Sequence, residues 1–407
     1  MKKFSLYFGV VFFLLINFLS FGYCQRGPIN PILSIESNDF ADLVFIDSLI
    51  ANKSIVFLGE SKHGVEDFNK MKFRIIRYLH EKHDFNLVVF EGSVHEVALT
   101  NILRDTLNSL EMLTQALMGY WRTESNCNMM KYLSENQIDI AGMDLVSHAL
   151  PPKKEFYKII YKDDILADKF FALDSLYNFK YRFERVNFYH NNRKTSIMGE
   201  NLDSLAKHLI HNYEEAVNEL KQIQIPNQKL LLWANNSLIR QIKEMNKING
   251  GYFNLLSAWR DSSMASNLMY AMSTIYPNQK TIVWAYDGHI SKNGNHQFLN
   301  SIGMYVDQTI KDQSVFIGLS AIDGTYSIGM NPPYPIKLKL KNIERKYKKI
   351  ITKGVFVQAT NLNLPGGMSF VGSIQSEDLQ ELFDGYIFLK DVRGSQLIKY
   401  NEPNNCK

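Results

Sequence analysis

The stretch SIVFLGESKHGVEDF, residues 54–68, joins a short apolar run to a helical pattern through a polar turn. Its first part, residues 54–59, is almost continuously apolar, as is typical of a strand that is covered on both faces of a parallel sheet. After the turn, apolar residues fall at positions 68, 71, 75, 76 and 79, which is the spacing of one helical face. The stretch therefore predicts a strand, a turn and a helix.

Five further apolar runs repeat this pattern and are separated by helix-like segments. They are NLVVFEG at 86–92, DIAGMDL at 139–145, TIVWAYDG at 281–288, VFIGLSA at 315–321 and DGYIFLK at 384–390. Alternation of this kind predicts an α/β fold whose core is a mainly parallel sheet flanked by helices.

Between residues 151 and 255 the strand-like runs disappear, and a polar, Tyr- and Asn-rich sequence with helical character takes their place. Pro151-Pro152 and Gly250-Gly251 punctuate its ends, where changes of chain direction are favoured. We interpret it as a helical insertion that caps the sheet edge. The predicted segments are a signal peptide at 1–24, the first half of the α/β core at 25–150, the insertion at 151–255 and the second half of the core at 256–407.

The first 24 residues have the features of an export signal. Lys2 and Lys3 precede an apolar run from Leu6 to Phe21, and Cys24 follows it. A permanent anchor needs roughly 20 apolar residues, and a lipoprotein signal needs a small residue where Tyr23 stands. We therefore expect a periplasmic or secreted protein without a stable membrane anchor after cleavage; an uncleaved anchor and a lipid on Cys24 are the alternatives.

Composition indicates the kind of partner. There are 45 Lys and Arg residues against 41 Asp and Glu, which gives a net charge of +4 that is spread along the chain. Nucleic-acid binding needs a concentrated basic face, and we interpret the basic residues between 337 and 350 as a solvated surface. Cys127 and Cys406 lie far apart in the mature sequence, so no disulfide framework is expected. The predicted partner is a small molecule, and the oligomeric state is left open.

Ionisable residues stand at the carboxyl ends of four predicted strands. Glu60 follows the first strand, Glu91 ends the second, Asp144 nearly ends the third, and His289 follows the fourth. Because ligands of open parallel sheets bind at the carboxyl edge, these residues predict one functional crevice.

The densest part of this pattern is the turn that holds Glu60 and His63, three residues apart between Gly59 and Gly64. A carboxylate beside an imidazole fixes the tautomer of the ring and favours proton uptake, so the pair predicts a general base. The alternative is that His63 is a helix-terminal residue bonded to backbone.

An ordered set of motifs resembles the erythromycin esterase family. The motifs are GESKHG at 59–64, HDFNLVVFEG at 83–92, WRTE at 121–124, AGMDL at 141–145, RDSSMASN at 260–267 and WAYDGHISK at 284–292. The resemblance spans about residues 54–390. It implies an α/β core with a helical insertion, and hydrolysis by an activated water without a covalent Ser or Cys intermediate. The sequence contains no GxSxG, HExxH or GxxxxGK[ST] motif, so serine hydrolase, zincin and P-loop classes lack their usual residues.

The resemblance also implies roles for individual residues. His63 would be the base that activates water, with Glu60 and Glu91 orienting it, and His289 would be a second polar group at the reacting carbonyl.

Two cations complete the implied site. Lys72 and Arg260 would stabilise a developing oxyanion, and Asp144 and Asp261 would orient these cations. For Lys72 a salt bridge to Glu60 or Glu91 is the alternative.

The sequence departs from the family at Tyr286-Asp287, where the family commonly has His-Asn. A tyrosine can donate a hydrogen bond to an oxyanion, although a phenol is a poor base at neutral pH. The departure bears on whether the substrate is a macrolide.

The leading prediction is an exported hydrolase of an ester or lactone that needs no cofactor, with macrolide antibiotics, and hence antibiotic resistance, as the candidate role. A metal-dependent hydrolase is the first alternative, because Glu60, His63, Glu91 and His289 are all ligand types for Zn²⁺ or Mn²⁺. A non-catalytic ligand-binding relative is the second.

Overall fold

The computed structural model describes residues 29–146, 149–185, 201–247, 252–293, 300–327, 333–337, 343–362 and 379–398, with only the backbone described for 252–258. The predicted signal peptide lies outside these residues. Within them, no helix is long and apolar enough to cross a membrane.

The core is an eight-stranded sheet in the order β1-β9-β10-β6-β2-β5-β3-β4. Its strands are β1 (Ile29–Ile32), β2 (Ile55–Leu58), β3 (Phe85–Ser93), β4 (Asp139–Asp144), β5 (Lys280–Trp284), β6 (Ser314–Ala321), β9 (Gly354–Gln358) and β10 (Gly385–Leu389). From β10 to β4 every neighbouring pair is parallel. The predicted fold class is confirmed.

One edge of the sheet was not predicted. Strand β9 pairs antiparallel with both β10 and β1, and a small hairpin of β7 (Thr325–Tyr326) and β8 (Tyr334–Pro335) lies apart from the main sheet. The predicted strand at 281–288 also ends early, because β5 stops at Trp284 and a short helix begins at Asp287.

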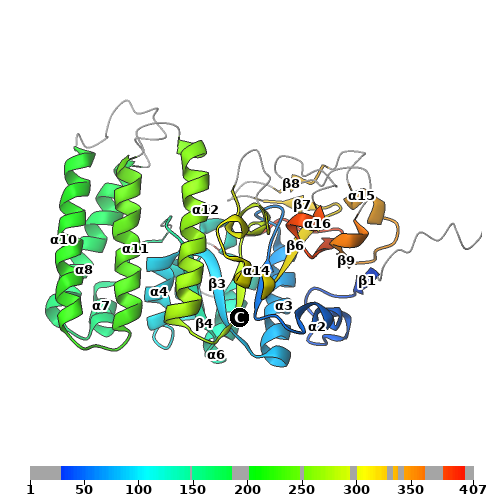
Figure 1. The fold of residues 1–407 in the computed structure, drawn as a ribbon, viewed down its shortest axis with the longest axis horizontal. Coiled ribbons are helices and arrows are strands. Elements are labelled where there is room, and N and C mark those ends of the chain that lie inside the picture. Colours follow the sequence, from blue (N-terminus) through cyan, green and yellow to red (C-terminus); the bar gives the residue numbers. More distant parts are fainter. Residues whose placement is uncertain are drawn as a thin grey trace, which may run out of the picture.

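Helices cover both faces of the sheet (Figure 1). The α-helices of the described residues include α2 (Phe45–Ile50), α3 (Glu66–His83), α4 (Val94–Ile102), α5 (Ser109–Ala116), α6 (Glu124–Glu135), α7 (Lys154–Tyr161), α8 (Asp164–Leu176), α10 (Leu202–Gln222), α11 (Gln228–Lys247), α12 (Tyr252–Tyr270), α13 (Asp287–Ile290), α14 (Gln308–Asp312), α15 (Glu344–Tyr347) and α16 (Leu379–Leu382). Alternate residues of one strand enter different apolar clusters: Val56 and Leu58 join the larger, and Ile55 and Phe57 the smaller. This division is what a strand buried on both faces requires.

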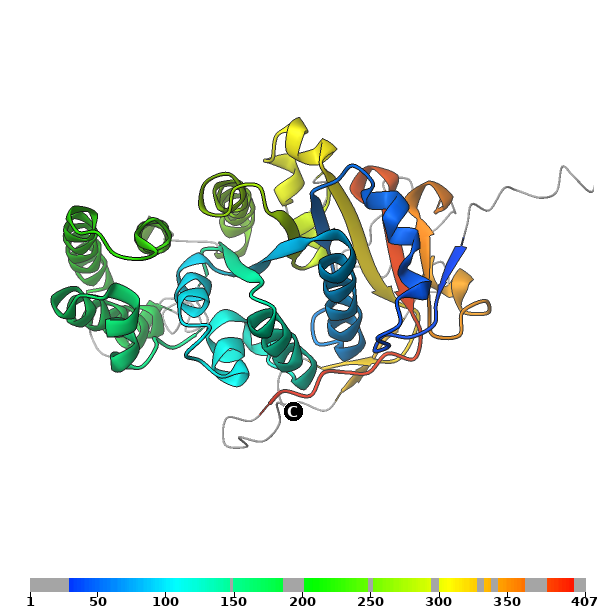
Figure 2. The same cartoon turned by 90° about the horizontal axis from the view of Figure 1, so that it is seen from below.

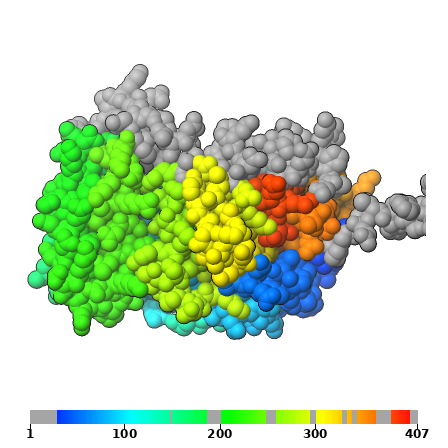
Figure 3. All heavy atoms as spheres, viewed as in Figure 1, coloured from blue at the N-terminus to red at the C-terminus, as the bar shows by residue number. Residues whose placement is uncertain are grey.

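Helices α7, α8, α10 and α11 gather at one end of the molecule beside α4, away from most of the sheet (Figure 1). Figure 3 shows the green surface of this end, to which α10 and α11 contribute. Among the described residues from 151 to 255 there is no strand. Helix α12 runs through the predicted boundary at 255, so the insertion and the second half of the core share one helix. The division of the chain into four segments stays a prediction.

A segment that we call the C-terminal strap, residues 392–398, joins two loops at the carboxyl edge of the sheet. In Figure 2 it is the red segment that runs past α3 and α6. Its backbone contacts with these loops include the bridge of Gly394 to Val65, the Ser395 N–H to Gly64 O hydrogen bond of 2.9 Å, the bridge of Leu397 to Thr123 and the Ile398 N–H to Arg122 O hydrogen bond of 2.9 Å. The strap therefore ties the start of α3 to the start of α6.

Cys127, buried on α6, is disulfide-bonded. The expectation of a fold without disulfide bonds is therefore wrong for this residue.

Candidate active site

Glu60 and His63 meet in the turn between β2 and α3. His63 Nδ1 lies 2.7 Å from Glu60 Oε1, and the side chain of His63 is 24% exposed whereas that of Glu60 is 2% exposed. Gly64 makes the turn possible, because its φ is +76° and an added Cβ would lie 1.9 Å from Ser327 O. The structure therefore presents the imidazole to solvent while its carboxylate partner is buried.

Lys72, on α3, holds the other oxygen of Glu60. Its Nζ lies 2.8 Å from Glu60 Oε2 and 3.9 Å from the centre of the Trp284 ring. Burial alone would raise the pKa of Glu60, but the charge of Lys72 and the hydrogen bond with His63 outweigh it and lower that pKa to about 2. Burial lowers the pKa of Lys72, although Glu60 opposes this shift.

The prediction that Lys72 stabilises a substrate oxyanion is wrong for this structure. Its side chain is 0% exposed, so a substrate has no access to the ammonium group. The alternative, a salt bridge to Glu60, is what the structure shows, and Lys72 stabilises the charge of that carboxylate instead.

Aromatic rings surround His63. Tyr120 stacks on it at 4.1 Å between ring centres, Tyr286 lies at 5.0 Å, and Trp121 approaches edge-on at 5.6 Å. The indole N–H of Trp121 also donates to Glu60 Oε1 at 2.8 Å. Sequence reasoning missed this bond, because its only signal was the place of Trp121 in the WRTE motif.

A second group of charges lies around Arg260 of α12. Arg260 Nη2 is 2.8 Å from Glu91 Oε1 and 2.6 Å from Asp144 Oδ2, and Arg260 Nε is 3.0 Å from the same Asp144 oxygen. Burial would lower the pKa of Arg260, but Asp144 and Glu91 raise it well above its ordinary value. The Arg260 side chain is 21% exposed, whereas those of Glu91 and Asp144 are 1% and 0% exposed. The cation is therefore fixed and still faces the solvent.

His289 belongs to this second group. Its Nδ1 lies 2.5 Å from Asp261 Oδ1, and its Nε2 lies 3.5 Å from Glu91 Oε1 and 3.3 Å from Arg260 Nη1. Burial would lower the pKa of His289, but Glu91 and Asp261 raise it above its ordinary value. Burial also raises the pKa of Asp261, although His289 opposes the shift. The surroundings of His289 favour its protonated form.

The prediction that Glu91 orients His63 is wrong. Glu91 instead contacts Arg260 and His289, and its Oε2 accepts the backbone N–H of Tyr286 at 2.9 Å. The reason is the strand order, in which β5 separates β2 from β3. The ring of Tyr286 connects the two groups, since its centre lies 5.0 Å from that of His63 and 6.1 Å from that of His289.

The four residues of the metal hypothesis do not come together as one ligand set. Glu60 contacts His63 and Lys72, whereas Glu91 contacts His289 and Arg260. Within the described part of the chain, no group of three or more His, Cys, Asp or Glu side chains is arranged to hold a metal ion.

Asp287 is a buried carboxyl next to this site. Its backbone N–H donates to Glu60 O at 3.0 Å, and its side chain packs against Gly59, where an added Cβ would lie 1.8 Å from Asp287 Oδ1. Burial raises the pKa of Asp287 well above its ordinary value, although Lys72 opposes the shift. Asparagine fits the same space without an ionisable group.

We predict that Asp287→Asn stabilises the protein at neutral pH. A carboxyl whose pKa is raised by folding stabilises the fold below its unfolded pKa of 3.8, and this contribution is lost as the pH rises towards the folded pKa. The substitution should increase the free energy of unfolding at pH 7 by about 1.4 kcal/mol for each unit by which folding raises the pKa of Asp287, counted up to pH 7. Urea unfolding of the wild type and of Asp287→Asn, at pH 7 and below pH 4, measures this increase. An increase in the free energy of unfolding that is equal at both pH values would contradict the prediction.

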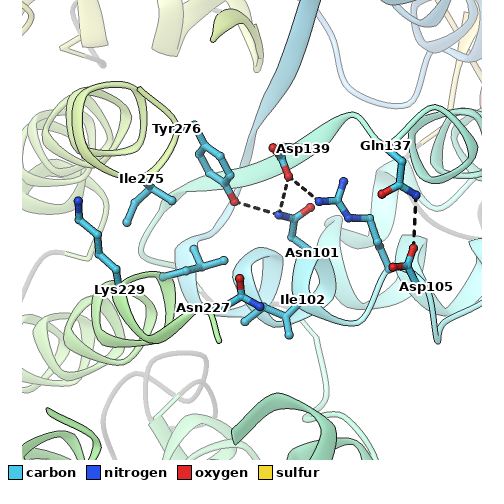
Figure 4. Close-up of a pocket in the computed structure, with 11 residues that line it drawn as sticks. Asn101, Ile102, Asp105, Gln137, Asp139, Asn227, Lys229, Ile275 and Tyr276 are labelled. Carbon is cyan, nitrogen blue, oxygen red and sulfur yellow. Dashed lines mark hydrogen bonds and ion pairs between the residues drawn. The ribbon is translucent and has the colours of Figure 1, made fainter. Parts of the chain in front are cut away.

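A separate pocket of about 460 Å³ lies at the opposite edge of the sheet, near Asp139, where β4 begins. Figure 4 shows that Asp139 bonds to Asn101, that Asn101 bonds to Tyr276, and that Gln137 bonds to Asp105. None of the predicted site residues lines this pocket. It is therefore distinct from the candidate active site.

Comparison with known families agrees with the motifs. The model of the family described as erythromycin esterase matches residues 80–392. The chain belongs to the erythromycin esterase family. The match begins after the turn that holds Glu60 and His63, so the place of these two residues in the site depends on the geometry above.

Two curated relatives belong to the same chemical class. The protein named "Putative hydrolase YbfO" of Bacillus subtilis (strain 168) is 23% identical in an alignment of 398 positions that covers 88% of each chain. The erythromycin esterase type I of Escherichia coli is 27% identical in an alignment of 140 positions that covers 31% of this chain and 32% of the relative. This family is one of hydrolytic enzymes.

Solved structures share the fold. A succinoglycan biosynthesis protein is 18% identical with a TM-score of 0.66, and the match covers 92% of this chain and 97% of that one. A mutant of the erythromycin esterase EreC in its open conformation is 17% identical with a TM-score of 0.58, covering 89% of this chain and 96% of that one.

Proposed function

We propose that this member of the erythromycin esterase family hydrolyses an ester or lactone with His63 as the general base. The observation that carries the proposal is the 2.7 Å contact of His63 Nδ1 with the buried Glu60 carboxylate, which leaves the partly exposed ring free to act through Nε2. A base of this kind takes a proton from water as the water attacks.

The second group of charges supplies the other requirement of such a reaction. When the water oxygen bonds to the carbonyl carbon, negative charge develops on the carbonyl oxygen. Arg260, fixed by two buried carboxylates, and His289, whose surroundings favour its protonated form, are donors suited to that charge. When the C–O bond breaks, the proton held by His63 passes to the leaving alkoxide, which yields an acid and an alcohol.

The test is mass spectrometry of erythromycin incubated with the purified mature protein, with and without a chelator. We expect the mass of one added water, with no effect of the chelator, because the proposed reaction uses no metal cofactor. Activity that is lost with the chelator and restored by Zn²⁺ or Mn²⁺ would favour the metal-dependent alternative.

A macrolide is our proposed substrate class, supported by family membership and by the name of the Escherichia coli relative. Tyr286-Asp287 is the feature that argues against it. A panel of simple esters and lactones tested beside erythromycin separates the two parts of the proposal. If the protein hydrolyses compounds of the panel but not erythromycin, the macrolide is rejected as substrate class and the hydrolase activity is retained. If it binds compounds but hydrolyses none of them, the non-catalytic alternative is favoured.

We also propose that the protein acts outside the cytoplasm, on a small molecule that it meets in the periplasm or the medium. The amino-terminal sequence supports this, and so does the disulfide bond of Cys127, because disulfide bonds persist in oxidising compartments. The intact mass of the protein purified from its native cell shows whether residues 1–24 are removed.

A further inference from the structure

We propose that Trp121 is a positioning residue for the catalytic base, an inference that rests on the proposed function of His63. Trp121 makes no contact with substrate in the scheme above. Its role is to fix the carboxylate of Glu60, and through it the ring of His63.

The carboxylate is held from three directions. Glu60 Oε1 receives the His63 ring at 2.7 Å and the indole N–H of Trp121 at 2.8 Å, and Oε2 faces Lys72 Nζ at 2.8 Å. Among the described residues, no other side chain is within hydrogen-bond distance of Oε1. Without the indole N–H, the His63 ring would be the one side-chain partner of that oxygen.

Trp121 is itself held firmly, as a positioning group must be. It is 0% exposed, and its ring packs edge-on against Trp284 with 6.2 Å between ring centres. Its backbone oxygen accepts the Asn126 side-chain amide at 2.8 Å. The C-terminal strap binds the next two residues, Arg122 and Thr123.

The short 3-10 helix η2 (Gly119–Trp121) acts on both members of the pair. Trp121 bonds the carboxylate of Glu60, while Tyr120 stacks on the ring of His63 with an angle of 22° between the planes. One rigid segment therefore sets the position of the carboxylate and the plane of the ring together.

The chemical consequence concerns the tautomer of His63. A carboxylate oxygen fixed at Nδ1 keeps the proton of the neutral ring on that nitrogen, so that Nε2 carries the lone pair that takes the proton of water. When the indole N–H is removed, Lys72 and the His63 ring alone hold the carboxylate, so Oε1 can shift from Nδ1. Part of the protein then holds the proton of the neutral ring on Nε2 and is inactive as a base.

Trp121→Phe tests this proposal, because it removes the N–H group and keeps an apolar ring. Trp233→Phe is the matched control: Trp233 is buried on α11 and packs against Tyr270 of α12. The ¹⁵N spectrum of histidine-labelled protein, with the His63 signals assigned by their loss in His63→Gln, should show one tautomer in the wild type and in Trp233→Phe. It should show a mixture in Trp121→Phe, with kcat about tenfold lower and KM unchanged, as expected for one hydrogen bond to a charged group.

An unchanged tautomer in a folded Trp121→Phe protein would overturn the proposal. If this variant fails to fold, Glu60→Gln provides the test. The chemical shift of the Trp121 indole proton should differ between Glu60→Gln and the wild type, because its acceptor becomes neutral. An unchanged chemical shift would contradict the proposal. The tautomer measurement needs no substrate. A mixture in Trp121→Phe beside a wild type that hydrolyses nothing would therefore reject the proposed function and retain the positioning role.

Discussion

His63→Ala is expected to lower kcat for ester or lactone hydrolysis by about 10² to 10⁴-fold, the usual contribution of a general base. His63 is the ring that the structure exposes to solvent at the site, and its carboxylate partner is buried behind it. Because the ring acts on water rather than on the substrate, KM should change little. Product mass spectrometry over a time course measures the rate.

The chain offers a closely matched control for this variant. His83 Nε2 lies 2.7 Å from Asp47 Oδ1, and the His83 side chain is 24% exposed, the same values as for the contact of His63 with Glu60. His83 ends α3, far from the turn at its start. His83→Ala should therefore leave turnover unchanged. Equal losses in the two variants, or full activity in His63→Ala, would reject His63 as the base.

The largest loss of stability is expected from Lys72→Met. It leaves the charge of Glu60, whose side chain is 2% exposed, without its buried counter-ion. Breaking a buried ion pair in this way typically costs about 3 to 5 kcal/mol. Lys243→Met is the control, because its pair with Glu214 is on the surface and such pairs contribute about 0 to 1 kcal/mol. Urea unfolding at pH 7 measures both.

The effect of Lys72→Met should depend on pH in a defined direction. The pKa of Glu60 is lowered from 4.5 to about 2 in the folded protein, so the stability that its charge contributes is present above pH 4.5 and is lost as the pH falls towards 2. The difference in free energy of unfolding between the wild type and Lys72→Met should therefore become smaller as the pH falls over that range. The double variant Glu60→Gln/Lys72→Met should be more stable at pH 7 than Lys72→Met, and an equal or lower stability would contradict the ion-pair account.

The sequence predicts the parallel core well because its strands are near-continuous apolar runs, and their carboxyl ends place Glu60, Glu91, Asp144 and His289 at one edge. Which of these side chains touch depends on the strand order. Strand β5 lies between β2 and β3 although it comes almost two hundred residues later in the chain. No local pattern encodes that order, so nothing in the sequence could correct the role beside His63 that the family resemblance implies for Glu91, which contacts Arg260 instead.

Short-range sequence patterns also did not predict two other features, the bond between Trp121 and Glu60 and strand β9. The bond from Trp121 to Glu60 joins residues 61 positions apart, and its donor lies in a 3-10 helix of three residues. Strand β9, GVFVQ, is not among the predicted strands, although β5 and β10 have the same length of five residues and are. Features of this kind are set by tertiary packing rather than by periodicity.

The C-terminal strap has a consequence for the order in which the protein is made. It contributes backbone hydrogen bonds to the loops that carry His63 and Trp121, and the side chain of Arg393 pairs with Asp67 at the start of α3. The described residues of the candidate site all precede it in the chain. A ribosome that has finished β10 has made Glu60, His63 and Trp121 but not the segment that ties their loops together. The turn that holds Glu60 and His63 thus gains its backbone ties to the start of α6 only after β10 has been made.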